Sequence, residues 1–397
     1  MGPRTRVIWD DCFTAYDFGR DHPMSPVRLD LTTRLARALG VLDDLEVVCP
    51  EVCPDDVLTT VHEPAYVAAV RAASDDPASA DERRGLGTED DPAFRGMHDA
   101  SARIAQGTID LCRAVWEGEI DHGVNYCGGM HHAMPTHASG FCIYNDAALG
   151  IRWLLDHGGA ARVAYVDIDV HHGDGVEKVF WDDPRVLTVS VHESGRHLFP
   201  GSGWPTDVGG PDAPGSAVNV ALPPGTSDAG WLRAIASTVP QVVHAFRPDV
   251  LVTQHGCDSH YEDPLAHLAI SLDAQRRAHE EMHSLAHEVT GGRWVALGGG
   301  GYAIIDVVPR SWTHLTAIAG HRPVHPEAAV PEEWLEHVRS TLGRSGPARM
   351  GDLDPAQLPI WVQPWSLGYN PDNPVDRAVM ATREAVFAHY GLDPYFD

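Results

Sequence analysis

The segment VAYVDIDVHHGDG at residues 163–175 carries acidic residues and histidines at a regular spacing. Asp167, Asp169 and His171 are two residues apart, so they project from one side of the chain if strand geometry continues through the segment. A central strand of a parallel sheet is normally apolar on both faces, and carboxylates buried there are destabilising unless a cation or hydrogen bonds compensate them. Asp169 and His171 are therefore predicted to be ligands of Zn²⁺ or a similar divalent ion.

A third metal ligand must come from another segment, because a catalytic zinc ion keeps three protein ligands and one open position. Asp258 follows the apolar run PDVLVTQHG at 248–256 and is the favoured candidate, while His255 and His260 compete with it. Two aspartates and one histidine do not distinguish Zn²⁺ from Fe²⁺.

The tandem histidines His131 and His132 follow two glycines and could move protons. An imidazole that takes a proton from water and returns it to a leaving amine needs a pKa near neutrality, and a carboxylate partner sets its tautomer. Tyr302 ends the run LGGGGY at 297–302 and is predicted to stabilise an oxyanion, an effect of roughly 2.7–4 kcal/mol for one donor. By itself LGGGGY could also be a phosphate-binding loop, but it lacks the Lys-Ser/Thr of a P-loop.

Short β-branched runs alternate with longer amphipathic stretches, which is typical of an α/β domain with a parallel sheet. Residues 74–91 and 200–224 are rich in Gly, Pro, Asp and Ser and are predicted to be long surface loops. Polar residues end most of the apolar runs, and they are expected to converge at the carboxyl ends of the strands. Strands are predicted at 6–10, 122–126, 161–170, 185–192, 248–256 and 293–301, and helices at 29–39, 104–116, 147–155, 230–246 and 273–289.

The overall composition excludes some classes of binding partner and some cellular locations. The 397 residues carry a formal net charge of −27, which argues against unaided binding to nucleic acid or to an anionic membrane. Seven scattered cysteines do not form a disulfide framework. The sequence contains neither a signal-peptide pattern nor an apolar stretch of membrane-spanning length, so a cytoplasmic location is expected.

Four segments resemble the signature segments of the histone deacetylase superfamily in the family's order, and QHGCDSH together with the tail after residue 325 resembles its acetoin-utilization branch most. The resemblance implies the arginase/deacetylase fold, a single three-layer α/β domain with a central, mainly parallel eight-stranded sheet flanked by helices. It covers about residues 7–320, so a catalytic domain at 1–320 is expected. After about Gly320 the composition shifts toward Pro and Trp, so residues 321–397 are expected to form a C-terminal extension packed on that domain, with helices near 331–342 and 375–390. The segments are GGMHHAMPTHASGFCIYND (128–146), YVDIDVHHGDGVE (165–177), QHGCDSHYEDP (254–264) and LGGGGY (297–302).

The resemblance also implies that the protein is a zinc-dependent lysine deacetylase. His132, paired with Asp174, would be the general base and acid. His131, held by Asp167, would stabilise charge in the transition state, so Asp167 would face the site without binding zinc. The substrate would be an acyl-lysine protein, and the acetoin-utilization branch suggests a metabolic enzyme such as an acetyl-CoA synthetase.

An acyl-lysine side chain requires a narrow apolar channel for its four methylene groups. By resemblance Phe141 and Phe199 form the aromatic walls of the channel, and Gly140 lines one side. Asp90 matches an aspartate at the rim that fixes the substrate backbone, although Glu89 and Asp91 flank it. Arg28 matches an arginine at the inner end of the pocket, where the released acetate would leave.

Family members also hold a monovalent cation, usually potassium, beside the catalytic residues. By resemblance Asp167 and Ser190 supply its side-chain ligands. The remaining ligands are backbone atoms, of Asp169, His171 and Val191 in this site and near Phe180, Asp183 and Val186 in a second one.

Three other functions compete with this interpretation. An arginase-type hydrolase would bind two manganese ions and would need carboxylates where this chain has Gly173 and Gly256. An acetylpolyamine amidohydrolase would be expected to carry an acidic residue at the pocket mouth, where this chain has Leu265. A non-catalytic acyl-lysine reader would be expected to have lost metal ligands or Tyr302. The predicted metal ligands and Tyr302 are all present in this chain, so an active enzyme is favoured over a reader.

Overall fold

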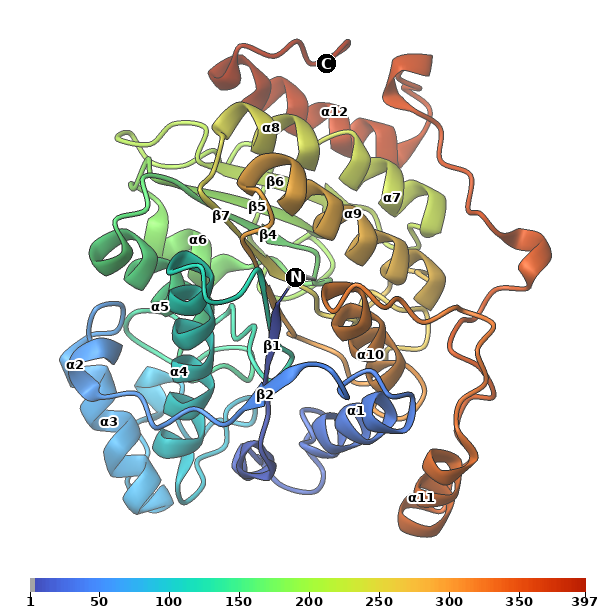
Figure 1. Ribbon diagram of the computed structural model, residues 1–397. Helices are drawn as coiled ribbons and strands as arrows, with labels where there is room; N and C mark the ends of the chain where they lie inside the picture. The colour runs from blue at the N-terminus through green and yellow to red at the C-terminus, as the bar shows by residue number, and fades with distance from the viewer. Residues whose placement is uncertain (1–3) are drawn as a thin grey trace.

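The apolar runs of the sequence form one sheet of eight strands at the centre of the protein (Figure 1). The computed structural model describes residues 4–397. The strand order is β2-β1-β3-β8-β7-β4-β5-β6, and every neighbouring pair is parallel. The predicted eight-stranded parallel sheet is thereby confirmed. The strands are β1 (Thr5–Ile8), β2 (Glu46–Val48), β3 (His122–Asn125), β4 (Val163–Asp167), β5 (Val186–Glu193), β6 (Ala217–Leu222), β7 (Val250–Gln254) and β8 (Trp294–Leu297).

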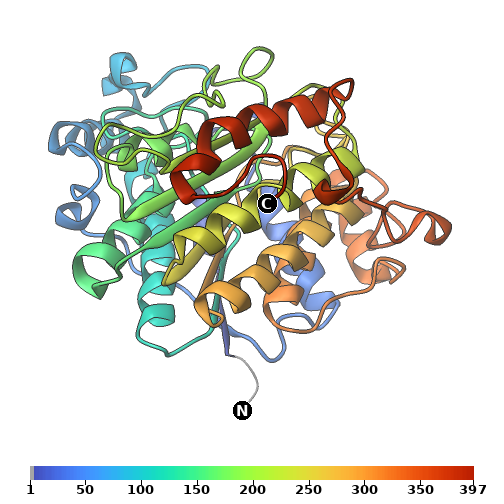
Figure 2. The same ribbon diagram turned by 90° about the horizontal axis from the view of Figure 1, so that it is seen from above.

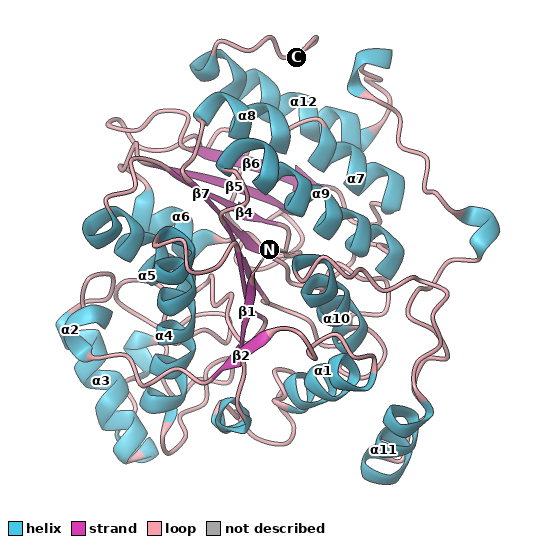
Figure 3. Ribbon diagram, in the orientation of Figure 1, coloured by secondary structure: helices cyan, strands magenta, loops and turns pink. Residues whose placement is uncertain are grey.

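Helices cover both faces of this sheet and complete three layers, with α3, α4 and α5 on one side and α1, α7, α8, α9 and α10 on the other (Figures 1 and 3). The amphipathic α4 and α9 each present a long buried face to the sheet, because their apolar residues recur at helical spacing. The helices are α1 (Val27–Ala38), α2 (Asp55–Leu58), α3 (Pro64–Asp75), α4 (Met97–Trp116), α5 (Asp146–Trp153), α6 (Asp174–Phe180), α7 (Asp228–Ala236), α8 (Val239–Phe246), α9 (Leu272–Thr290), α10 (Val308–Ala319), α11 (Glu332–Leu342) and α12 (Pro374–Val386).

Two sequence predictions about these elements are wrong. The helix expected at 230–246 is divided into α7 and α8, with Pro240 in the first turn of α8. A proline inside a helix removes one backbone hydrogen bond and clashes with the carbonyl four residues earlier, so the helix ends before it. The loop expected at 200–224 contains the edge strand β6, whose short apolar run AVNVAL is flanked by Gly and Pro.

The strand that carries the metal motif also ends earlier than predicted. β4 stops at Asp167, so Asp169 and His171 lie on the loop that follows it. Side-chain hydrogen bonds shape this loop: the Asp169 N–H donates to Asp167 Oδ1 at 3.1 Å, and the His171 N–H donates to Asp169 Oδ1 at 2.9 Å. Aspartates commonly turn the backbone in this way, two residues at a time. The positions of Asp169 and His171 are therefore set by turns in this loop, and the predicted strand geometry does not continue through the motif.

The segment 321–397 runs along the outside of the body and shares its core. α11 packs near α1, and α12 packs against β6 and α7 (Figures 1 and 2). Trp365, Val379 and Phe387 belong to the main hydrophobic core. Arg233 of α7 also forms a buried ion pair with Asp376 at 2.7 Å.

Asp352 links this segment to the carboxyl-end loops. Its Oδ2 accepts hydrogen bonds from His260 Nε2 and from the Leu272 N–H, both at 2.8 Å, and its Oδ1 lies 2.9 Å from Arg310 Nη1. Burial by itself would raise the pKa of Asp352, but His260 and Arg310 outweigh it and hold that pKa well below its usual value.

We expect Asp352→Asn to lower the free energy of unfolding by about 3–5 kcal/mol, because it leaves a buried guanidinium without its partner. The pKa of Asp352 is lower in the folded protein, so its contribution is fully present above the unfolded value of about 3.9 and is lost as pH falls below it. Urea unfolding at pH 7 measures the first effect and its repetition at about pH 3, below the unfolded pKa of about 3.9, measures the second, with Asp372→Asn, at an exposed site, as the control. Equal stability of Asp352→Asn and wild type at pH 7 would contradict this role.

Candidate active site

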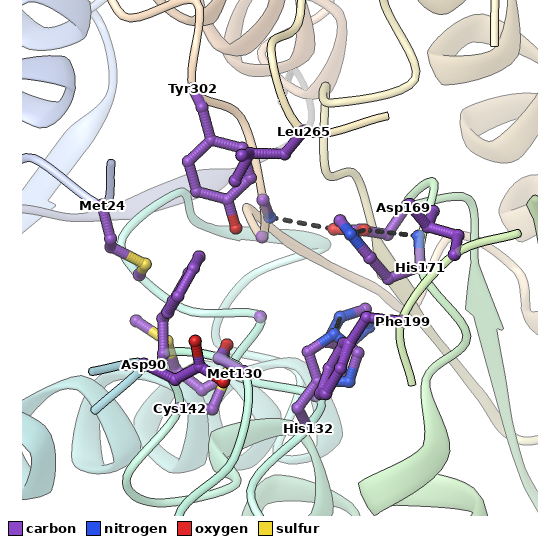
Figure 4. A pocket seen from close by; sticks show the side chains of 17 residues that line it. Met24, Asp90, Met130, His132, Cys142, Asp169, His171, Phe199, Leu265 and Tyr302 are labelled. Atoms are coloured by element: carbon purple, nitrogen blue, oxygen red, sulfur yellow. Dashed lines mark hydrogen bonds and ion pairs between the residues drawn. The ribbon is translucent and has the colours of Figure 1, made fainter. Parts of the chain in front are cut away.

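A pocket of about 220 Å³ opens at the carboxyl ends of the strands, where the sequence predicts a ligand site (Figure 4). The loops that follow β1, β3, β4, β5, β7 and β8 line it, and they contribute the groups predicted to do chemistry. Figure 4 shows Tyr302 on the opposite side of the pocket from His132. The lining residues include Met24, Asp90, His131, His132, Gly140, Phe141, Asp169, His171, Leu198, Phe199, Leu265, Gly300 and Tyr302.

Asp169, His171 and Asp258 form a buried cluster whose ligand atoms all lie within 4.8 Å of one another. His171 Nδ1 lies 3.1 Å from Asp169 Oδ1 and 3.1 Å from Asp258 Oδ2. Burial and the charge of Asp169 raise the pKa of Asp258 to about 6, so these carboxylates favour a cation between them. One imidazole and two carboxylates are a donor set that suits a divalent transition metal.

Glycines make room for this cluster. A Cβ atom on Gly256 would lie 1.8 Å from Asp169 Oδ2, and one on Gly300 would lie 1.9 Å from Asp258 Oδ2. A Cβ on Gly173 would lie 2.3 Å from Asp167 Oδ2. A carboxylate for a second metal ion could therefore not occupy position 256 without moving the ligand Asp169, nor position 173 without moving Asp167. This geometry is that of a mononuclear site.

The two other candidates for the third ligand point elsewhere. His255 Nε2 lies 2.6 Å from Thr253 Oγ1, and its ring packs on His279. His260 donates to Asp352. Asp258 is thus the one of these three residues that reaches Asp169 and His171.

The tandem histidines each have a carboxylate behind them. His131 Nδ1 lies 2.8 Å from Asp167 Oδ2, and His132 Nδ1 lies 2.7 Å from Asp174 Oδ1. The two Nε2 atoms are 3.0 Å apart, and both residues line the pocket. A carboxylate at Nδ1 fixes the tautomer of each ring and leaves Nε2 available to exchange a proton.

Their environments separate the two rings electrostatically. Burial lowers the pKa of His131, but Asp167 and Asp169 outweigh burial and raise it to about 9. Burial and the charge of His131 lower the pKa of His132 to about 4 in spite of Asp174. One ring therefore favours the charged form and its neighbour the neutral form.

Tyr302 is positioned by the loop that follows β8. Its backbone N–H donates to Asp263 Oδ2 at 2.8 Å, and burial raises the pKa of its phenol well above the usual value, so the hydroxyl remains a donor. Arg28 supports the same loop, because its Nη1 donates to the carbonyls of Gly299 at 2.9 Å and Gly301 at 3.1 Å. The structure therefore places Arg28 behind the glycine run.

Aromatic side chains form the walls of the pocket. The Phe199 ring lies 5.0 Å from the His132 ring, and the Phe141 ring lies 5.7 Å from the Tyr302 ring. A Cβ on Gly140 would lie 2.5 Å from His132 Cδ2, and its φ of 55° also favours glycine. The wall is therefore closed to any larger residue at position 140.

The structure also shows which of the consecutive acidic residues Glu89, Asp90 and Asp91 lies at the pocket. Asp90 is exposed and lines the pocket. Asp91 is buried, and burial together with the charge of Asp90 raises the pKa of Asp91 to about 8. Of the three consecutive acidic residues, Asp90 alone belongs to the pocket lining.

Sequence reasoning missed two residues that hold the site together. Gln254 Nε2 donates to Asp169 Oδ2 at 2.8 Å, and Asp263 accepts the N–H groups of Tyr302 and Leu265. Gln254 ends β7 with a polar side chain, which is the signal that selected the other site residues. Asp263 lies in a loop, and its sequence position carries no comparable signal.

The residues expected to bind potassium lie in two places. Asp167 and Ser190 are paired neighbours on β4 and β5. The carbonyls of Phe180 and Asp183 accept the N–H groups of Asp183 and Val186, in consecutive turns between α6 and β5. Potassium binding at either place remains a prediction.

The family model described as histone deacetylase domain matches residues 22–319. The chain belongs to the histone deacetylase family. The protein is accordingly a hydrolase of the deacetylase type, and the family assignment made from the four sequence segments is confirmed.

The similar proteins include acetoin utilization proteins AcuC from two genera. The chain is 40% identical to that of Bacillus subtilis (strain 168) over 331 residues, which cover 83% of this chain and 84% of the relative. It is 39% identical to that of Staphylococcus xylosus over 338 residues, or 84% and 87% of the two chains. This similarity confirms the predicted relation to the acetoin-utilization branch. No helix within residues 4–397 is long and apolar enough to cross a membrane.

Proposed function

We propose that the protein is a zinc-dependent deacetylase that hydrolyses the acyl-amide bond of acyl-lysine side chains in proteins. The observation that carries this proposal is one pocket in which an aromatic channel leads to Asp169, His171 and Asp258. His132 and Tyr302 lie on opposite sides of this pocket (Figure 4). A reader protein would have no need for this combination of groups.

Each side chain has a task in this reaction. A zinc ion held by Asp169, His171 and Asp258 would polarise the amide carbonyl and the attacking water. His132 takes a proton from the water and delivers it to the leaving lysine amine, while Asp174 holds its tautomer. Tyr302 donates its hydroxyl hydrogen to the oxyanion that forms.

Several finer points belong to the same proposal. Fe²⁺ could replace Zn²⁺ in this donor set. Asp167 and Ser190 would hold a potassium ion beside the tandem histidines. The substrate would be a cytoplasmic metabolic enzyme, with an acetyl-CoA synthetase as the first candidate.

The choice between protein acyl-lysine and acetylpolyamine depends on the pocket mouth. Leu265 lines the pocket there, and an apolar residue offers no charge to a cationic polyamine. We expect kcat/KM for an acetyl-lysine peptide to exceed that for acetylspermidine by at least about tenfold, which corresponds to about 1.4 kcal/mol. A preference for acetylspermidine would overturn the proposed substrate class.

A pair of variants tests the cause of this preference. Leu265→Glu is expected to raise the rate on acetylspermidine relative to the peptide, because it supplies the missing negative charge. Leu265→Gln has nearly the same shape without the charge and should not raise that ratio. Equal behaviour of the two variants would show that charge at the mouth does not select the substrate.

A further inference from the structure

Four histidines meet at the amino ends of the central strands, at the opposite edge of the sheet from the active-site pocket. His122 begins β3, His283 and His287 lie on α9, and His321 follows α10. One ring nitrogen from each lies within 4.8 Å of those of the others. We call this group the four-histidine cluster. It contains none of the residues that line the pocket.

The backbone brings these rings together by local means. His283 and His287 are four residues apart on α9 and therefore share one face of the helix, with their Nε2 atoms 3.2 Å apart. His321 has a φ of 56°, and its ring stacks on that of His122 at 4.8 Å. A Cβ atom on Gly292 would lie 3.1 Å from the His287 ring, so glycine leaves room for that ring.

His122 supplies a buried ring nitrogen that has no partner in the described part of the chain. Its Nδ1 lies 2.7 Å from the carbonyl oxygen of Ala319, so Nδ1 carries the proton and donates it. Its Nε2 is then left with a lone pair, and it has no hydrogen-bond partner among residues 4–397 although the residue is 0% exposed. A buried polar atom without a partner is costly, which points to a ligand at this position.

The charge state of the cluster also suits a metal ion. No carboxylate within residues 4–397 forms an ion pair with any of the four rings, unlike the histidines of the active site. Burial and the neighbouring imidazoles lower the pKa of His122 to about 4 and that of His283 to about 3. His122 and His283 therefore favour the neutral form, and neutral imidazole is the form that binds transition metals.

We propose that the four-histidine cluster binds a divalent transition-metal ion, with Zn²⁺, Ni²⁺ or Cu²⁺ as the ions whose chemistry suits four imidazoles. Such an ion would join β3 to α9 and to the first residue of the segment 321–397. It would close loops between residues far apart in sequence and so stabilise the folded chain. This site does not depend on the proposed function, because it shares no residue with the active site.

Metal quantification after equilibration with Zn²⁺ and removal of free ion tests the proposal. We expect two equivalents of zinc in the wild type, one in His171→Ala, one in His287→Gln, and none in the double variant. His325→Gln makes the same change at a side chain that is 69% exposed and should keep two equivalents. Deacetylation should persist in His287→Gln, which separates this site from the catalytic one.

A titration of the His171→Ala protein with Zn²⁺ provides a second measurement. Adding His283→Gln or His287→Gln should weaken zinc binding by at least about 10–100-fold. Loss of an outer-shell partner already weakens a metal site by that factor, and these two residues would be direct ligands. The zinc-induced rise in Tm should decrease accordingly. Unchanged zinc affinity in both variants, or no zinc bound by His171→Ala, would overturn the proposal. His287 is exposed, so its replacement leaves the core intact.

Discussion

Replacing His132 with alanine is expected to lower kcat by about 100- to 10,000-fold while the metal content stays unchanged. His132 lines the pocket, and Asp174 holds its Nδ1 at 2.7 Å, which leaves Nε2 as the nitrogen that can exchange a proton. The ring contacts His171 only edge to face, with centroids 5.7 Å apart, and is not one of the three clustered metal-binding groups. Proton transfer should therefore be lost without loss of the metal site.

Steady-state kinetics on an acetyl-lysine peptide, together with metal quantification, measure both parts of this result. His197→Ala is the matched control, because it removes an exposed imidazole two residues from Phe199. The control should keep nearly full activity. Undiminished turnover by His132→Ala would remove His132 from the mechanism. Loss of metal from this variant would indicate that His132 is itself a metal ligand.

Replacing Asp258 with asparagine is expected to weaken metal binding by at least about 100-fold and to abolish turnover. Loss of an outer-shell partner already weakens a metal site by up to about 100-fold, and Asp258 would be a direct ligand. The side chain is 0% exposed and its Oδ2 faces His171. Its Oδ1 accepts the Val170 N–H at 3.0 Å, a hydrogen bond that an amide oxygen can also accept. The substitution therefore removes one negative charge from the site and preserves the local fold.

Asp263→Asn is the matched control for this prediction. It makes the same chemical change at another buried carboxylate, five residues later, whose contacts are backbone N–H groups and not metal-binding side chains. We expect it to keep its metal. Retention of metal by Asp258→Asn, or equal loss in both variants, would contradict the assignment of Asp258 as a ligand.

Much of the candidate site could be predicted from the sequence, because its residues directly follow apolar strands. Asp169, His171 and Asp258 come within a few residues of a strand end, and Tyr302 follows a glycine run. The carboxyl ends of parallel strands meet at one edge, so such residues converge whatever the details of the loops. The order of four short segments was enough to indicate the family.

Two secondary-structure elements were predicted wrongly from the sequence because one residue or one neighbouring strand outweighs the surrounding pattern. The amphipathic pattern at 230–246 continues through Pro240, but proline ends a helix regardless of the pattern around it. β6 consists of six residues among glycines and prolines, and its pairing with β5 is what stabilises it. A strand of that length gains most of its stability from its neighbour, which a single sequence does not display.

The sequence by itself determined the fold class, the family and the residues that bring chemistry to the pocket. Only the tertiary structure decided which of Asp258, His255 and His260 reaches the other metal-binding groups, because successive side chains at a strand end point in different directions. It alone brought His122 together with His321, which is 199 positions later in the numbering of the chain. Local patterns record the period of a strand or helix, whereas contacts between distant segments arise only when the layers pack.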